Sequence, residues 1–79
     1  MAKHLKNISL KTFRDYLIYK GLKKIRTKGG HEIWAGSTVK RPIVLQTHID
    51  PIPEFIIRNN LRTLNVDADD FIKFLITRN

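Results

Sequence analysis

The chain has 79 residues, including 15 Lys or Arg and seven Asp or Glu, and its formal net charge is +8. This length accommodates one domain, which we expect to span residues 1–79. The absence of cysteine excludes disulfide bridges and thiolate metal sites. The apolar runs are far shorter than the ~18 residues of a membrane span, and the N-terminus lacks the apolar stretch of a secretory signal. We therefore expect a soluble, cytoplasmic protein with no membrane partner.

The N-terminal part predicts a helix from Ser9 to about Lys20. Serine is a favoured N-cap, and Gly21 can end the helix in the left-handed conformation. Phe13 and Leu17 recur at helical spacing and predict a buried stripe.

Three strands are expected next, over residues 22–27, 31–35 and 41–46. The run Lys28-Gly29-Gly30 between the first two is a tight-turn signal, because paired glycines adopt positive φ freely. Pro42 marks a strand beginning or an edge position. The short connections predict an antiparallel meander with helices packed on one face.

The remaining sequence predicts two helices. Pro53 suits a first helical position, Asn65 suits a left-handed end, and Asp67 can cap a short last helix. Apolar side chains recur at three- and four-residue spacings on both helices: Ile57, Leu61, Leu64, Phe71, Phe74 and Leu75. The predicted fold class is α+β, α–β–β–β–α, with a three-stranded antiparallel sheet, helices on one face and a short extra C-terminal helix.

The charge is distributed unevenly along the chain. Residues 1–48 hold eleven Lys and Arg but only two acidic residues, whereas the remainder is nearly balanced. The basic density peaks between Lys20 and Lys28. This asymmetry predicts a polyanion-binding face made by the first half of the chain. The alternative is a solvated surface that serves solubility.

The three histidines differ in context. His4 lies near the N-terminus, where we expect fraying and no function. His31 directly follows the Gly-Gly turn and begins a strand, while His48 ends the third strand. In an antiparallel sheet both imidazoles can lie at one end, but their proximity depends on strand register.

An imidazole near neutral pH can perform the proton transfers that RNA cleavage needs. His31 is the candidate catalytic residue and His48 an auxiliary candidate. Nearby cations can stabilise the charge that develops on phosphorus. No metal-ligand set is recognisable, and we expect no cofactor. The alternative is that His31 is a surface residue beside a turn. The predicted RNA-binding residues are Lys23, Lys24, Arg26, Lys28, Gly29 and Gly30.

The order of these motifs resembles the HicA (YcfA-like) toxin family. In that family a helix ends in Gly, a strand follows, and a Lys-Gly-Ser-His motif opens the next strand before an aromatic residue. Here the corresponding runs are Gly21-Leu22 and Arg26-x-Lys28-Gly29-Gly30-His31-x-Ile33-Trp34, followed by Pro42 to His48 as the third strand. Arg58, Leu61 and Asp70-Phe71 also fit, so the resemblance covers about residues 9–76.

The resemblance implies a double-stranded-RNA-binding-like fold and an mRNA-cleaving toxin of a type II toxin–antitoxin pair. The family's catalytic histidine corresponds to His31, and its partner is a HicB-type antitoxin that covers the active site. The sequence departs from the family pattern in two places. Gly30 stands in place of the family serine, and Phe55-Ile56 in place of the usual Gly-Thr before the last long helix.

Other interpretations remain open at this point. A non-catalytic RNA-binding module would share the charge evidence without needing a histidine. A protein-interaction domain would use the basic face for an acidic partner. Trp34 belongs either to the core, which the resemblance favours, or to an exposed platform that stacks on a base. If Trp34 is core, alternation leaves His31 exposed.

Overall fold

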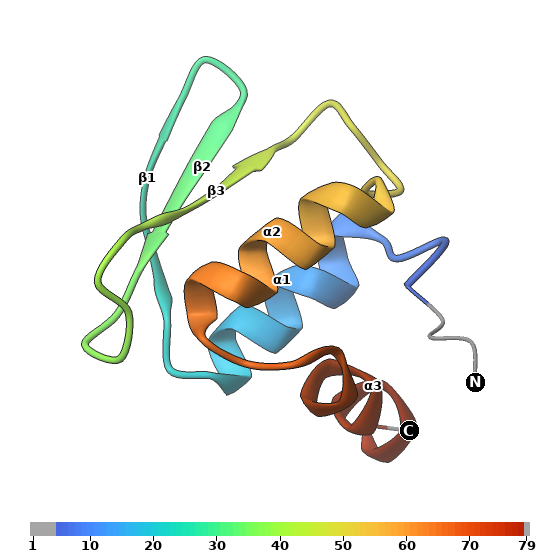
Figure 1. The fold of residues 1–79 in the computed structure, drawn as a ribbon. Helices are drawn as coiled ribbons and strands as arrows, with labels where there is room; N and C mark the ends of the chain where they lie inside the picture. The colour runs from blue at the N-terminus through green and yellow to red at the C-terminus, as the bar shows by residue number, and fades with distance from the viewer. Residues whose placement is uncertain (1–4, 79) are drawn as a thin grey trace.

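The computed structural model describes residues 5–78, which form three helices and three strands (Figure 1). The sequence prediction of an α+β fold with an additional C-terminal helix is confirmed. That last helix has ten residues, as many as the first. His4 lies outside the described residues. In chain order the elements are α1 (Leu10–Tyr19), β1 (Lys23–Lys28), β2 (His31–Ala35), β3 (Ile43–Gln46), α2 (Glu54–Leu64) and α3 (Ala68–Thr77).

Local capping interactions set the helix boundaries. The side chains of Ser9 and Asp67 each accept a hydrogen bond of 3.0 Å from a backbone N–H in the first turn of their helix, α1 and α3. Gly21, with φ of 89°, and Asn65, with φ of 61°, follow α1 and α2 in positive-φ conformations. These four predictions are confirmed. Pro53 is the N-cap of α2 rather than its first residue, because its ψ of 145° is extended.

The strand boundaries differ slightly from those expected. β1 begins and ends one residue later than predicted, and β2 coincides with its prediction. β3 begins at Ile43 rather than Arg41. Pro42 has no backbone N–H to donate to the neighbouring strand, so the ladder starts after it.

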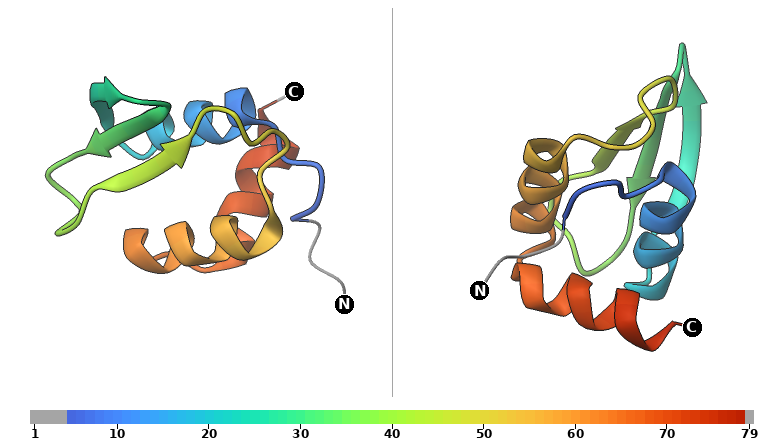
Figure 2. Two further views of the ribbon diagram at one scale, coloured as in Figure 1. Left: turned by 90° about the horizontal axis from the view of Figure 1, so that it is seen from above. Right: turned by 90° about the vertical axis from the view of Figure 1, so that its right-hand side faces the viewer.

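The sheet is an antiparallel meander with the order β1-β2-β3. Figures 1 and 2 show α1 and α2 on the same side of the sheet. Side chains on β2 and β3 alternate accordingly between a buried face, with Glu32, Trp34, Ile43 and Leu45, and an open face.

The core lies between the sheet and the helices. Trp34 is only 4% exposed and belongs to the same buried cluster as Leu17 of α1 and Ile57 of α2. Trp34 is therefore a core residue, as expected, and His31 projects from the opposite face and is exposed.

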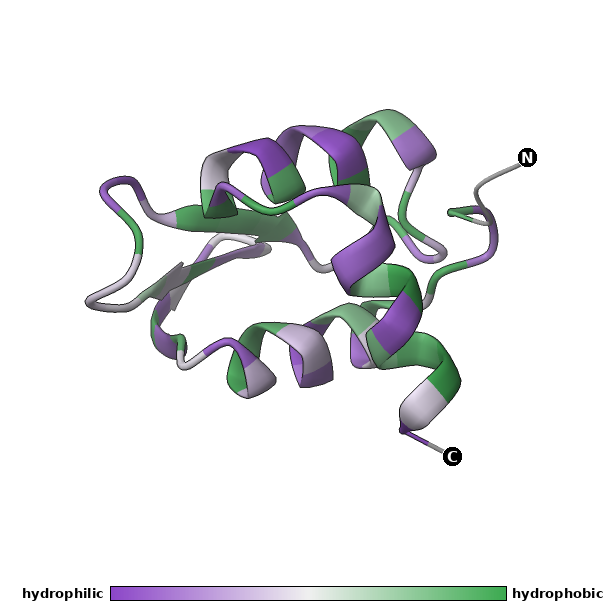
Figure 3. Cartoon of the chain, turned by 60° about the horizontal axis from the view of Figure 1, so that its bottom comes forward, coloured by the Kyte–Doolittle hydropathy of each residue, from purple (hydrophilic) through white to green (hydrophobic). Residues whose placement is uncertain are grey.

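The third helix closes the end of this core. Phe71 packs edge-on against Phe13 and Tyr16 of α1, with ring centroids 5.5 Å and 4.8 Å apart. Figure 3 shows α3 as strongly hydrophobic over much of its length. Within residues 5–78, however, no helix combines the length and apolar character that a membrane crossing requires.

Candidate functional site

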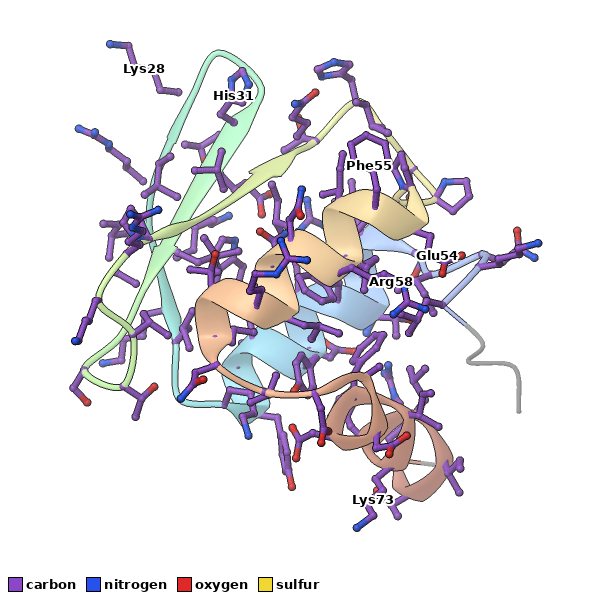
Figure 4. All side chains as sticks on the ribbon, viewed as in Figure 1. Lys28, His31, Glu54, Phe55, Arg58 and Lys73 are labelled. Atoms are coloured by element: carbon purple, nitrogen blue, oxygen red, sulfur yellow. The ribbon has the colours of Figure 1, made fainter. Side chains whose placement is uncertain are left out.

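A two-residue turn brings Lys28 and His31 opposite each other. Gly29 and Gly30 have φ values of 55° and 84°, and two consecutive positive φ angles are typical of a tight hairpin turn whose twist matches its strands. Lys28 and His31 are the final pair of the β1–β2 ladder, so both side chains project from the same face. Figure 4 shows both at the tip of the hairpin.

The same register aligns rows of side chains across the open face. His31 pairs with Lys28 on one side and Gln46 on the other. In the next row, Ile33 pairs with Arg26 and with Val44. The exposed imidazole of His31 therefore has one cation beside it in its own row and another in the adjacent row.

His48 lies at the same turn. A Cβ atom built on Gly30 would be 3.7 Å from His48 Nδ1 and 3.7 Å from Thr47 Oγ1. Thr47 is tied to the turn, because its backbone N and its Oγ1 both donate to the Gly30 carbonyl, at 2.8 Å and 3.1 Å. Strand register thus brings the auxiliary candidate His48 next to the residue that precedes His31.

The glycine at position 30 has a conformational reason. Its φ of 84° is one that L-amino acids with side chains rarely adopt, whereas nothing crowds the position sterically. A serine here would be strained by the backbone rather than by its neighbours. Glycine rather than serine at position 30 therefore suits the turn that this chain forms.

A bulge in β1 divides the predicted RNA-binding lysines between the two faces. The register shifts between Lys24 and Arg26, so Lys24 pairs with Trp34 and Arg26 with Ile33. Lys24 consequently shares the face of the buried Trp34. Lys23, which pairs with Ala35, is on the open face but at the far end of the ladder from His31. Arg26 and Lys28 are therefore the predicted cations that lie on the His31 face near it.

Sequence reasoning missed the buried carboxylate beneath the site. Glu32 is 4% exposed and is held by Arg14 of α1, whose Nε and Nη2 donate to its two carboxylate oxygens at 3.0 Å and 2.6 Å. Trp34 Nε1 donates to the same carboxylate at 3.1 Å. The available signal was alternation, which puts Glu32 on the core face with Trp34.

This network fixes the charge state of Glu32. Burial alone would raise the pKa of Glu32, but the hydrogen bonds from Arg14 and Trp34 and the charges of Arg14 and Lys24 outweigh it and leave the pKa lowered. Glu32 is therefore an anion that anchors β2 to α1. Because neighbouring residues on a strand point to opposite faces, its carboxylate points away from the His31 imidazole.

The reactive groups of the candidate site are imidazoles and cationic side chains. Among residues 5–78, no group of three or more His, Asp or Glu side chains is placed to hold a metal ion. Two imidazoles at one turn, with a lysine and an arginine on the adjoining face, can exchange protons and stabilise an anion.

No protein-family model, curated protein or solved structure matches the chain.

Proposed function

We propose that the chain is a metal-independent endoribonuclease that cleaves mRNA, with His31 as general acid or base. The observation that supports this most is the construction of the hairpin tip. There, Lys28 pairs directly with His31, and His48 Nδ1 lies 3.7 Å from the Cβ position of Gly30. These groups are exposed, as a polymeric substrate requires.

The proposed reaction needs two proton transfers. One imidazole removes the proton of a ribose 2′-OH, and the 2′ oxygen attacks the adjacent phosphorus. The bond from phosphorus to the 5′ oxygen breaks, and the second imidazole protonates that oxygen. The products are a 2′,3′-cyclic phosphate and a free 5′-OH. Lys28 and Arg26 stabilise the additional negative charge on the phosphorane.

For the cellular role, we propose a toxin of a type II toxin–antitoxin pair that acts on mRNA in the cytoplasm. The resemblance of residues 9–76 to the HicA family supports this role. The net charge of +8 also suits neutralisation by a HicB-type antitoxin with acidic side chains over the basic face.

The direct test is cleavage of a 5′-labelled mRNA transcript by highly purified protein in excess EDTA. His31→Ala is expected to reduce the rate by about 10²–10⁴-fold. His4→Ala, the matched histidine control, should cleave like the wild type, with 2′,3′-cyclic phosphate ends in the products. Unchanged cleavage by His31→Ala would show that the assignment is wrong. Binding without cleavage by the wild type would favour the RNA-binding module.

The cellular role is tested by induced expression, with growth and mRNA integrity followed in the same cultures. We expect arrest and mRNA loss with the wild type but not with His31→Ala. Co-expression of a small protein encoded by the neighbouring gene should restore growth. Arrest without mRNA loss would contradict the proposed mode of action.

A further inference from the structure

A basic groove lies at the end of the sheet opposite the hairpin tip. It has a volume of about 450 Å³ and separates the loop after β2 from the C-terminal end of α2. Figure 1 shows this loop and this helix end close together, away from the β1–β2 turn. Three cations and no carboxylate line it. The lining residues are Thr38, Val39, Lys40, Arg41, Arg62, Thr63 and Asn65.

The groove cations have no acidic partner within the described part of the chain. None of the ion pairs of residues 5–78 involves Lys40, Arg41 or Arg62. Arg62 donates one hydrogen bond, from Nη1 to the neutral side chain of Asn59 at 3.3 Å. All three side chains belong to exposed residues, so their charge is available to an anion from solution.

Three carboxylates outside the groove are held by cations that are also outside it. Glu32 binds Arg14, Glu54 binds Arg58, and Asp70 binds Lys20. The lining of the groove itself carries three cations and no carboxylate, so its own charge is positive.

The partial negative charge at the C-terminal end of α2 offsets the positive charge of the groove only weakly. A helix C-terminus carries roughly −0.5 of an elementary charge, compared with three unit positive charges on the groove side chains. Two of its carbonyls are also capped, since Asn65 N donates to Arg62 O at 3.0 Å and Val66 N to Leu61 O at 3.1 Å. The net charge of the groove is therefore positive and favours binding of an anion.

The groove is lined by residues whose side chains carry the kinds of donor that bind phosphate. Arg41 and Arg62 carry planar guanidinium groups, which bind phosphate oxygens in a bidentate manner. The Thr38 hydroxyl and the Asn65 amide add neutral donors on the same lining. The groove is open to solvent rather than enclosed, so a phosphodiester within a longer chain can enter it.

We infer that this groove binds a backbone phosphate of the RNA substrate, at a distance from the hairpin tip. The inference rests on the proposed function, because it takes RNA as the ligand. Gln46, the partner of His31, is five residues from Arg41, and because Arg41 precedes β3 the two backbones are at most about 17 Å apart. A stacked strand advances roughly 3.4 Å per phosphate, so at most about five nucleotides separate the two contacts. The groove thus adds affinity without contacting the cleaved bond.

The test is the salt dependence of binding, measured by fluorescence anisotropy. The probe is a labelled 12-nucleotide RNA with 2′-O-methyl riboses, which retains every phosphate but lacks the attacking hydroxyl. Arg41→Gln/Arg62→Gln is compared with Lys6→Gln/Lys73→Gln, which removes the same charge from exposed residues outside the groove. Thermal unfolding verifies that both double variants remain folded.

Loss of this phosphate contact should reduce the slope of log K against log salt by about 0.7 and weaken binding on the order of tenfold at moderate salt. The control should retain the wild-type slope. Equal slopes in the two double variants would overturn the inference while leaving the proposed function intact. That result together with amide shifts of Thr38 and Asn65 on addition of inorganic phosphate would identify a free-anion site instead. No RNA binding by the wild type would count against both, whereas cleavage by His31→Ala would contradict only the proposed function.

Discussion

Lys28 and His31 are direct partners across the two-glycine turn, on the face of the sheet that carries no helix. Because paired residues of an antiparallel ladder share a face, the ammonium group and the imidazole project from the same side of the hairpin tip. Glu32, the next residue, is buried beneath them. The proposed proton transfer and charge stabilisation therefore belong to the exposed face, whereas the buried face anchors the strand to α1.

Two lysines of one strand provide a matched test of this assignment. Lys28→Gln should reduce RNA cleavage at least about tenfold, since its side chain lies on the His31 face. Lys24→Gln should have a much smaller effect, because the bulge turns it to the face of Trp34. Initial cleavage rates at constant salt measure both. Equal losses would indicate that only net charge matters.

His48 is expected to supply the second proton transfer. His48→Ala should reduce the rate of cleavage by about 10²-fold or more, because it removes the second imidazole at the turn. His4→Ala serves as the control and should cleave at the wild-type rate. A wild-type rate in the His48 variant would assign the second transfer to another group.

Glu32 should be a large contributor to stability. Glu32→Gln removes the charge that holds Arg14, which we expect to cost about 2 kcal/mol. Glu54→Gln is the control, because it removes an exposed carboxylate that pairs with Arg58 at 2.9 Å one helical turn away, a type of pair worth about 0.5 kcal/mol or less. Urea unfolding measures both free energies. Equal costs would show that burial adds nothing to the Glu32 pair.

The lowered pKa of Glu32 predicts a pH dependence of that difference. As pH falls, the unfolded chain takes up a proton at this residue before the folded one does, so protonation favours unfolding. The stabilisation is fully present above the ordinary pKa of about 4.3 and is lost as pH falls below it toward the folded value. The difference in free energy of unfolding between wild type and Glu32→Gln should thus become smaller from pH 6 to pH 3.5. A difference that does not change with pH would contradict the conclusion that Glu32 is ionised in the folded protein.

The turn glycines should tolerate substitution unequally. Gly30→Ala is expected to lower the free energy of unfolding by about 1–2 kcal/mol, because φ of 84° is unfavourable for a residue with a Cβ. Gly29→Asn should cost less, since φ of 55° lies in the left-handed region that asparagine adopts. Thermal unfolding of both variants checks the order. The reverse order would indicate that contacts to Thr47 and His48 dominate over backbone strain.

The sequence by itself determined the elements and their order, whereas the core position of Trp34 was decided by the structure. The elements depend on interactions between residues near each other in the chain: Ser9 and Asp67 cap helices that begin beside them, and Gly29-Gly30 forms its turn locally. Hydrophobic periodicity then selects the buried face of the helices. Local interactions were enough to predict these elements, because none of them requires the identification of a residue far away in the sequence.

Only the tertiary structure decided how the candidate residues meet. A one-residue shift of register reverses the face of every side chain, and the bulge between Lys24 and Arg26 introduces such a shift within β1. The approach of His48 to Gly30 follows from the pairing of β2 with β3, and the ion pair of Glu32 with Arg14 from packing of α1 on the sheet. The basic groove likewise joins a loop and a helix end that are some twenty residues apart. Each of these relationships depends on the packing of separate elements, which local propensity does not specify.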